Sequence, residues 1–294
     1  MSSALSDEGR RLNSGQHTFN VRLAGSGPPL LLLHGFTGSS ANWLPLLPRL
    51  AAEHHVLALD LIGHGDSDAP TATAAYAMDA AVHDLATLLD ALRVPRADVL
   101  GYSMGARVAL AFAVHQPARV RRLVLESGSP GLADEGERGA RRASDERLAE
   151  MLERDGVQPF IDFWEGQPLF ASQASLPPAR REELRRQRLR NSSTGLAGSL
   201  RGMGTGSQAS LWDRLPDVQM PALVLAGELD VKYTAIGRTM VAALPSATMT
   251  IVPGAGHSIH FEQPDHYAQL IAQFLPASAG STHSIVSGGT SYDR

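Results

Sequence analysis

The chain has 294 residues, of which 43% are hydrophobic and 19% charged, and its formal net charge is −4 at pH 7. This composition is typical of a globular protein with one large or two small domains, and the negative net charge gives no attraction to nucleic acid. Because the sequence has no Cys, disulfides, thiolate nucleophiles and zinc–thiolate sites are excluded.

Both ends of the chain are predicted to be disordered. Residues 1–16 and 276–294 are rich in small and polar side chains and offer little to bury. The start lacks the apolar core of a secretory signal, and no apolar run approaches the ~20 residues that span a membrane. We therefore expect a cytoplasmic protein that does not contact a membrane. The sequence predicts no particular oligomeric state.

Short aliphatic runs alternate with amphipathic segments over residues 17–130 and 212–275, which form the predicted core domain. The runs lie at residues 30–33, 56–59, 98–100, 122–125, 222–226 and 248–252. Segments with apolar residues three and four apart lie at residues 78–92, 106–115 and 236–244. Buried strands that alternate with helices predict an α/β fold with a mostly parallel, doubly wound sheet.

Residues 131–211 interrupt this alternation. They contain no aliphatic run but include amphipathic segments at residues 144–153 and 179–189. Unstructured loops longer than about 15 residues are uncommon in compact domains. We therefore predict a helical lid that is inserted between two strands of the sheet. The Arg side chains of this interval are accompanied by a similar number of Asp and Glu side chains, so most are interpreted as solvated.

A candidate nucleophile follows the run that ends at Leu100. Gly101-Tyr102-Ser103-Met104-Gly105 has the pattern G-x-S-x-G, and a helical segment follows directly. Between a strand and a helix, this pattern is typical of a nucleophile elbow, because small flanking residues allow the tight turn that lifts the Ser hydroxyl above the sheet. The alternative is a Gly-rich turn that contains Ser103 by chance.

Ser103 needs a general base oriented by a carboxylate, because an alcohol is a poor nucleophile near neutral pH. In this architecture the partners follow in the order Ser, Asp, His, each after a later strand. Asp230 follows the run at residues 222–226 and is the predicted carboxylate. Glu228 is an alternative in the same loop. Asp217 is another, although it precedes the run and so lies at the opposite end of the strand.

His257 is the predicted general base. It follows the run at residues 248–252 and the turn Pro253-Gly254-Ala255-Gly256, whose glycines allow the loop to reach Ser103. His260 and His266 are the alternatives, and both are predicted to lie in the next helix. The other histidines show no metal-ligand spacing, so we predict neither a metal site nor a cofactor.

Two backbone N–H groups would complete the catalytic machinery. The run at residues 30–33 leads into His34-Gly35-Phe36-Thr37-Gly38. The loop after this strand and the residue after the nucleophile supply the donors of an oxyanion hole, so we assign them to Phe36 and Met104. His34 is interpreted as holding the loop.

Gly63-His64-Gly65-Asp66-Ser67 lacks the Lys of a phosphate-binding loop and is interpreted as a structural turn.

Four segments together resemble the α/β-hydrolase superfamily, over residues 30–275. They are His34-Gly35-Phe36, Asp60-Leu61-Ile62-Gly63-His64-Gly65-Asp66-Ser67, the Ser103 elbow and Gly254-Ala255-Gly256-His257. The resemblance implies the α/β-hydrolase fold, which carries esterases, lipases, peroxidases, C–C hydrolases and lyases. Because position 103 is Ser, the resemblance argues against the haloalkane dehalogenase and epoxide hydrolase branches, which carry Asp there.

A narrower resemblance lies around the elbow and in the predicted lid. Its segments are Tyr102-Ser103-Met104-Gly105-Ala106-Arg107, Glu126-Ser127-Gly128-Ser129-Pro130-Gly131-Leu132, Arg141-Arg142, Phe163-Trp164, Gln167-Pro168-Leu169-Phe170, Arg190-Asn191, Met203-Gly204-Thr205-Gly206 and Leu211-Trp212. They resemble the 2-succinyl-6-hydroxy-2,4-cyclohexadiene-1-carboxylate (SHCHC) synthases of menaquinone biosynthesis. One departure is Ala106, where the family pattern has a second Gly.

This resemblance implies a carbon–oxygen lyase that removes pyruvate from 2-succinyl-5-enolpyruvyl-6-hydroxy-3-cyclohexene-1-carboxylate. It also implies the roles of individual residues. Those implied for the catalytic triad are Ser103, Asp230 and His257, and those implied for the substrate pocket are Tyr102, Arg107, Arg141, Trp164 and Arg190.

The chemistry of the implied substrate fits an Arg-rich pocket. It bears three carboxylates, and guanidinium groups bind carboxylates through two parallel charge-assisted hydrogen bonds. Arg107 lies one turn into the helix after Ser103, among apolar neighbours. A charge there is costly unless it faces a ligand or a partner. We predict that it faces a small anionic substrate; the alternative is an ion pair with an acid such as Glu126.

Two other functions use the same scaffold. A serine esterase or C–C bond hydrolase would need the same triad as the lyase. A non-catalytic ligand-binding protein would not need a complete set of Ser103, Asp230 and His257, which disfavours it. A nucleic-acid-binding protein would need a basic excess that this chain lacks.

Overall fold

An eight-stranded sheet forms the centre of the molecule in the computed structural model, which describes residues 9–275. Its order is β1-β2-β4-β3-β5-β6-β7-β8. The strands are β1 (Arg10–Ser14), β2 (His17–Ala24), β3 (Pro29–Leu33), β4 (His55–Leu59), β5 (Ala97–Tyr102), β6 (Val120–Glu126), β7 (Ala222–Gly227) and β8 (Ala247–Val252). Strands β3 to β8 are parallel, whereas β2 runs antiparallel to β1 and β4. The six predicted runs lie within β3 to β8.

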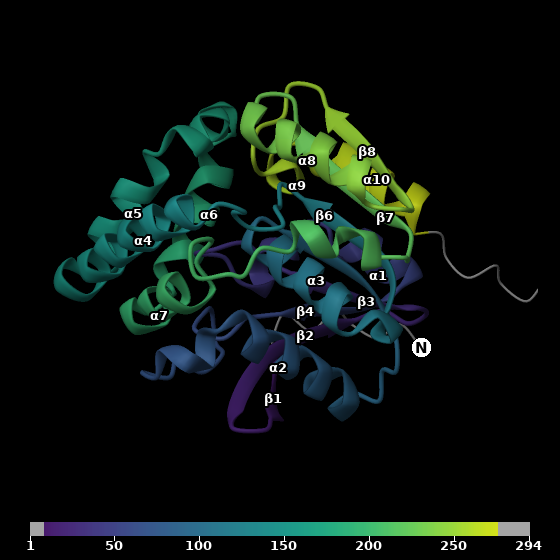
Figure 1. Cartoon of the computed structure of the whole chain (residues 1–294), viewed down its shortest axis with the longest axis horizontal. Helices are drawn as coiled ribbons and strands as arrows, with labels where there is room; N and C mark the ends of the chain where they lie inside the picture. The colour runs from purple at the N-terminus through teal and green to yellow at the C-terminus, as the bar shows by residue number, and fades with distance from the viewer. Residues whose placement is uncertain (1–8, 276–294) are drawn as a thin grey trace, which may run out of the picture.

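Helices cover both faces of the sheet (Figure 1). They are α1 (Leu47–Glu53), α2 (Met78–Ala91), α3 (Met104–His115), α8 (Val231–Ala243), α9 (Ile259–Glu262) and α10 (Pro264–Phe274). Leu31 and Leu33 pack in one core with α2, α3 and α8, while Leu30 and Leu32 pack in another with α1 and α10. Burial on both faces explains why β3 is apolar at successive positions. Within residues 9–275, no helix combines the length and the apolar character that a bilayer crossing requires.

The N-terminal region differs from the sequence prediction. Disorder is predicted for residues 1–16, but Arg10–Ser14 form β1, which pairs with β2 from Arg10 opposite Val21 to Ser14 opposite His17. The prediction is wrong there because β1 is a mostly polar edge strand, held by backbone hydrogen bonds to its neighbour more than by apolar burial. Residues 1–8 and the predicted tail at 276–294 lie outside the described residues.

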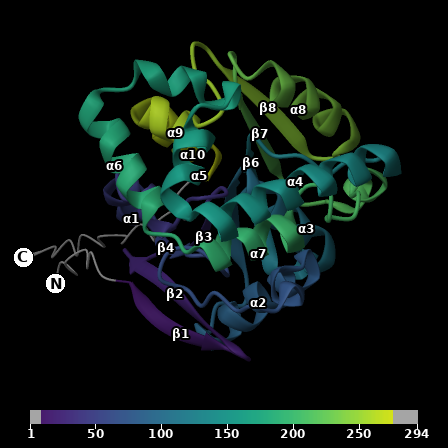
Figure 2. The ribbon, with the colours of Figure 1, turned by 90° about the vertical axis from the view of Figure 1, so that its left-hand side faces the viewer.

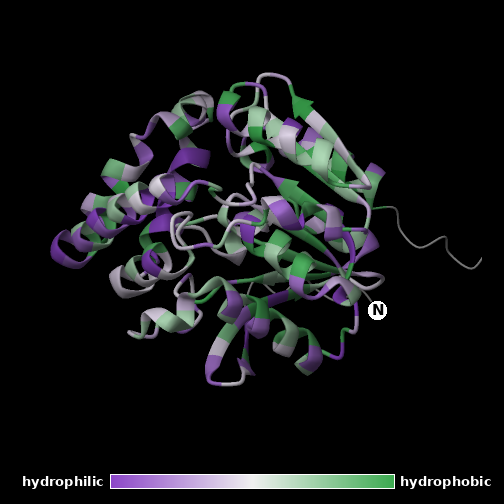
Figure 3. Cartoon of the chain, in the orientation of Figure 1, coloured by the Kyte–Doolittle hydropathy of each residue, from purple (hydrophilic) through white to green (hydrophobic). Residues whose placement is uncertain are grey.

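A helical insertion separates β6 from β7 (Figure 2). It consists of α4 (Glu135–Asp155), α5 (Val157–Glu165), a 3-10 helix (Pro168–Ser175), α6 (Pro178–Leu189) and α7 (Ser193–Met203). Buried side chains of α4, α5 and α7 form their own small apolar core, which includes Leu152, Phe160 and Leu196. Figure 3 shows many hydrophilic residues on α4. These helices lie within residues 131–211, and their action as a lid stays a prediction.

Candidate active site

The turn between β5 and α3 presents Ser103 at the carboxyl edge of the sheet. Ser103 has φ 51° and ψ −108°, a left-handed backbone conformation that is strained for a residue with a side chain. A Cβ atom at Gly101 would lie 2.2 Å from the carbonyl oxygen of Gly105, and one at Gly105 would lie 2.2 Å from that of Leu33. The two glycines are therefore needed for the backbone to turn this tightly.

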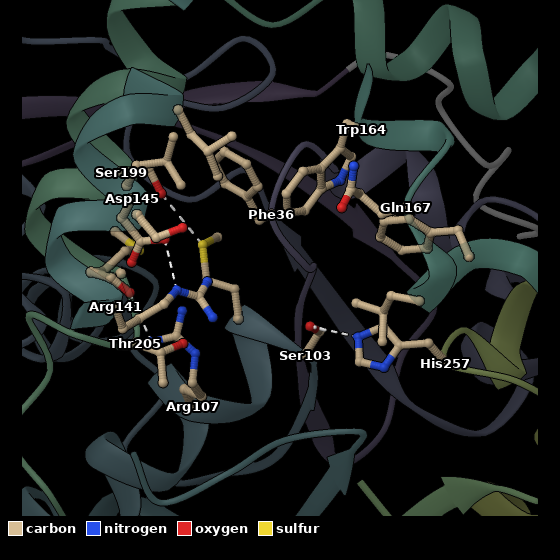
Figure 4. A pocket seen from close by; sticks show the side chains of 18 of the residues that line it. Phe36, Ser103, Arg107, Arg141, Asp145, Trp164, Gln167, Ser199, Thr205 and His257 are labelled. Carbon is tan, nitrogen blue, oxygen red and sulfur yellow. Dashed lines mark hydrogen bonds and ion pairs between the residues drawn. The ribbon is translucent and has the colours of Figure 1, made fainter. Parts of the chain in front are cut away.

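His257 and Asp230 lie in line with Ser103. His257 Nε2 is 2.9 Å from Ser103 Oγ (Figure 4). On the other side of the ring, His257 Nδ1 is 2.6 Å from Asp230 Oδ2. The carboxylate accepts a hydrogen bond from Nδ1–H, so Nε2 carries no proton and can accept that of the Ser hydroxyl. Asp230 Oδ1 also accepts a hydrogen bond from the backbone N–H of Tyr233 and thereby caps α8. This arrangement is the geometry of a serine nucleophile with its general base.

The alternative acids contact other groups. Glu228 accepts a hydrogen bond from the backbone N–H of Gly254 at 2.8 Å. Asp217 forms an ion pair with Arg214 at 2.6 Å. Of the two carboxylates in the loop after β7, only Asp230 reaches His257 among the described residues.

The alternative bases also lie elsewhere. His260 lies in α9, where its Nδ1 is 2.8 Å from Glu126 Oε1. His266 lies in α10 and contacts Gln263. The sequence prediction that both belong to helices after the glycine turn agrees with these positions.

The loop after β3 brings Phe36 to the nucleophile. Phe36 and Met104 both line the cavity that contains Ser103. His34 holds the loop, because its Nδ1 donates to the carbonyl oxygen of Gly35 at 2.8 Å and its Nε2 accepts from the N–H of Leu61 at 3.0 Å. Burial lowers the pKa of His34, which favours the neutral ring that these two bonds require.

The cavity has a volume of about 430 Å³ and lies between the sheet edge and the helical insertion. Aromatic side chains from both regions meet at its wall. Trp164 of α5 packs edge-on against Phe36 at 5.3 Å between ring centroids and stacks on Phe160 at 5.7 Å. Trp164 Nε1 is buried without a hydrogen-bond partner in the described part of the chain. This N–H is available to donate a hydrogen bond to a ligand in the cavity.

Arg107 is buried at one side of the cavity, with only 8% of its surface exposed. Its Nη1 donates to two neutral acceptors, the carbonyl oxygen of Met203 at 2.7 Å and Gln208 Oε1 at 2.8 Å. Within residues 9–275 no carboxylate forms an ion pair with it, and the acid proposed as its alternative partner, Glu126, pairs with His260. Burial lowers the pKa of Arg107 to about 10, so the guanidinium stays charged at neutral pH.

Arg141 and Asp145 lie one turn apart on α4 and both line the cavity. Arg141 Nε is 2.8 Å from Asp145 Oδ1, whereas Asp145 Oδ2 is buried without a partner among the described residues. Burial raises the pKa of Asp145. In Figure 4, Arg107, Arg141 and Asp145 gather on one side of the pocket and the Ser103–His257 pair lies on the other.

Tyr102, which precedes the nucleophile, also lines the cavity. Its hydroxyl shares a 2.5 Å hydrogen bond with Ser258 Oγ. Burial raises the pKa of Tyr102, so the phenol is neutral. Because Ser258 follows His257 directly, this bond ties the nucleophile turn to the loop of the base.

The prediction that Arg190 lines the pocket does not hold in this structure. Its side chain is 63% exposed and forms an ion pair with Asp66 at 3.0 Å, outside the cavity. Arg190 caps the end of α6, where the chain turns toward the loop that contains Asp66. Arg188 of the same helix is buried instead and pairs with Glu165 at 2.9 Å.

Several cavity residues were missed by the sequence interpretation. Asp145 carried a usable signal, because it lies four residues after Arg141 on a predicted helix. Lys232 and Tyr233 also line the cavity and lie two and three residues after Asp230 in the chain. Gln208, which binds Arg107, follows the helical insertion and had no local signal.

Comparison with known proteins identifies the fold family and the relatives of this chain. Residues 28–264 match the model of the alpha/beta hydrolase fold family. The chain is 44% identical to a candidate SHCHC synthase of Bacillus subtilis, over 84% of this chain and 89% of the relative. It is 35% identical to the SHCHC synthase of Klebsiella pneumoniae, over 84% of this chain and 94% of the relative.

A solved structure gives the same result. The structure of MenH from S. aureus superposes with a TM-score of 0.84 at 33% identity, over 89% of this chain and 98% of that one. The chain therefore belongs to the alpha/beta hydrolase fold family and, within it, to the family of SHCHC synthases.

Proposed function

We propose that this protein is an SHCHC synthase, a lyase that eliminates pyruvate from 2-succinyl-5-enolpyruvyl-6-hydroxy-3-cyclohexene-1-carboxylate in menaquinone biosynthesis. The family membership supports this reaction. The observation that carries it in the structure is the pairing of a Ser–His–Asp arrangement with a buried guanidinium, Arg107, that has no carboxylate partner among residues 9–275. An enzyme for neutral esters would have no use for that charge.

Ser103 acts as a base in this mechanism. His257 accepts the proton of Ser103 Oγ, and the oxygen removes the proton from the carbon next to the succinyl ketone. The 2.6 Å contact with Asp230 stabilises the imidazolium that forms. The electron pair of the broken C–H bond moves through the ring and breaks the C–O bond to the enolpyruvyl group. The enolpyruvyl group leaves as the enolate of pyruvate, and protonation of its methylene carbon gives pyruvate and balances the proton taken up by His257. No acyl-enzyme or water is needed.

The backbone N–H groups of Phe36 and Met104 stabilise the developing enolate oxygen. Both residues lie beside Ser103 in the cavity. A donor in such a position is typically worth about 10²- to 10³-fold in rate, because it meets the charge where the charge develops. Their fixed positions follow from the loop held by His34 and from the first turn of α3.

Arg107 and Arg141 bind carboxylates of the substrate, and Tyr102 and Trp164 form polar and aromatic parts of the pocket. Arg107 has only neutral hydrogen-bond partners among the described residues, so it can give its full charge to an anion. The helical insertion acts as a lid that excludes water from the enolate. Because a molecule with three carboxylates does not cross a bilayer unaided, we place the reaction in the cytoplasm.

The reaction is tested with the purified protein and the enolpyruvyl substrate, by following pyruvate through its reduction by lactate dehydrogenase. Ser103→Ala is expected to lower the rate by about 10³-fold or more. Unchanged pyruvate release in this variant would contradict the mechanism. Rapid release of p-nitrophenol from p-nitrophenyl acetate, with no pyruvate from the enolpyruvyl substrate, would identify a serine esterase instead.

A further inference from the structure

The single Lys of the chain lies at the active-site cavity. Lys and Arg number 26, and all of them are Arg except Lys232. Lys232 lines the cavity together with Tyr233 and His257. An ammonium group is a compact point charge on a flexible stem, whereas a guanidinium is a planar fork. The chain thus places its one mobile point charge beside the catalytic base.

Helix stability does not explain a cation at this position. Asp230 is the N-cap of α8, so Lys232 is the second residue of the helix, and the first turn contains no acidic residue. The amino end of a helix carries partial positive charge, and a cation there is destabilising. Asp230 is also fixed by its bond to His257, so Lys232 is attached to the same rigid turn as the triad.

Lys232 has no ion-pair partner among residues 9–275. Its ammonium lies 5.7 Å from the centre of the Tyr233 ring, a cation–π contact. The Tyr233 ring in turn lies 4.7 Å from the ring of His257. Arg141 differs, because it shares its charge with Asp145, which its Nε contacts at 2.8 Å, and has its other guanidinium nitrogens left for a ligand. Lys232 is therefore a cation whose charge is available to a ligand.

Among the residues that the structure describes, three cationic side chains line the cavity, Arg107, Arg141 and Lys232, together with one carboxylate, Asp145. Arg107 is buried, whereas Lys232 is exposed, so Lys232 lies on the solvent side of the cavity. We propose that Lys232 is a substrate-specificity residue that binds one carboxylate of the anionic substrate at the mouth of the cavity. This inference rests on the proposed function, in which the substrate carries three carboxylates.

A charge at the mouth acts on capture and retention of the substrate rather than on bond breaking. Replacing Lys232 should therefore raise KM and leave kcat nearly unchanged. Because the charge is exposed, its contribution is screened by salt. The value of kcat/KM should fall with ionic strength in the wild type and fall less steeply without Lys232.

The test compares Lys232→Gln with Arg238→Gln. Arg238 lies on the same helix, is exposed, does not line the cavity and has no ion pair in the described part of the chain. Lys232→Gln is expected to raise KM for pyruvate release about fivefold, the range of one exposed ion pair, and Arg238→Gln is expected to leave it unchanged. Lys232→Arg keeps the charge and should stay within about twofold of the wild type.

Substrate binding to the Ser103→Ala protein, measured by calorimetry, separates this inference from the proposed function. Adding Lys232→Gln should weaken binding and so raise the Kd about fivefold. If the wild type releases pyruvate but Lys232→Gln behaves like Arg238→Gln, the role of Lys232 is wrong and the proposed function stands. A fall in kcat with unchanged KM also contradicts the role.

If the wild type binds the substrate through Lys232 but releases no pyruvate, the proposed function fails and the inference holds. If the substrate does not bind, both fail.

Discussion

Two carboxylate–imidazole pairs pack against Tyr102. Asp230 and His257 are 2.6 Å apart, and Glu126 and His260 are 2.8 Å apart. Both imidazoles are buried, and both rings pack on Tyr102, at 5.5 Å and 4.5 Å between centroids. By contact with a carboxylate alone, either His could be the base.

The far nitrogen of each ring distinguishes the pairs. Nε2 of His257 reaches Ser103 at the cavity. Nε2 of His260 is buried without a partner in the described part of the chain, and Trp43 and Tyr267 pack around the ring at 4.8 Å and 5.9 Å. A carboxylate–imidazole pair becomes catalytic only where its second nitrogen meets a reacting group. The Glu126–His260 pair is therefore structural, and its imidazole packs against Tyr102.

Removing the base should have the largest effect. His257→Ala is expected to lower kcat for pyruvate release by about 10³- to 10⁴-fold, because among the described residues His257 is the side chain that is hydrogen-bonded to Ser103 Oγ. The free energy of unfolding should change far less than activity does. Steady-state pyruvate release, with urea unfolding as the control for folding, measures both. A variant that keeps a tenth of the wild-type kcat would show that another base operates.

Removing the other imidazole should affect stability instead. His260→Ala removes the imidazole partner of buried Glu126, which keeps the backbone N–H of residue 260 as a donor, and opens a cavity beside Trp43. We therefore expect a loss of about 3 kcal/mol in unfolding free energy. The kcat of the folded protein should fall by less than about tenfold, since His260 touches no reacting atom. Urea unfolding gives the stability, and rates corrected for the folded fraction give kcat. A loss of activity as large as in His257→Ala would place both pairs in the mechanism.

Two arginines can likewise be distinguished by whether the side chain faces the cavity, as Arg107 does, or solvent, as Arg190 does. Arg107→Gln should lower kcat/KM for the enolpyruvyl substrate about 100-fold, because a buried charge-assisted contact is lost. Arg190→Gln, which removes an exposed ion pair with Asp66, should change it by less than about twofold. The two variants are compared by pyruvate release at equal protein concentration. Equal losses of kcat/KM in the two variants would show that Arg190 contacts the substrate.

The sequence was sufficient where local geometry decides the outcome. The Ser103 turn, Asp230 and His257 each follow a strand at the carboxyl edge of the sheet, so their order along the chain and the flanking glycines predict their meeting. His260 could be separated from His257 for the same reason, because it comes after the turn. The positions of these three residues depend on where the strands end, and the aliphatic runs in the sequence mark those ends.

Other positions depend on packing that no short motif describes. Arg190 and Arg188 lie two residues apart on one helix, and only the orientation of α6 on the sheet decides that Arg188 is buried and Arg190 exposed. β1 has too few apolar residues to be recognised without its partner strand. Gln208 meets Arg107 across 101 residues of sequence. Such contacts follow from the tertiary fold.

A third kind of buried imidazole gives the smallest expected effect. His64 donates from Nδ1 to the carbonyl oxygen of Ile62 at 3.0 Å and has no carboxylate bonded to it among residues 9–275. Burial lowers its pKa to about 3. Below the ordinary pKa of about 6.5, the unfolded chain binds a proton at this ring and the folded protein does not, so stability falls as the pH falls.

The slope starts at half its limit at pH 6.5 and approaches about 1.4 kcal/mol per pH unit below, so the loss between pH 6.5 and pH 5 is about 1.6 kcal/mol. His64→Gln should therefore lose about 1.6 kcal/mol less than the wild type over this interval, whatever its stability at pH 7. Urea unfolding at both pH values measures the difference. Asp84, whose pKa burial raises to about 6, contributes the opposite slope, but it is present in both proteins and cancels. Identical pH dependence in the two proteins would mean that His64 binds its proton in the folded state, and hence that burial without a carboxylate does not keep an imidazole neutral here.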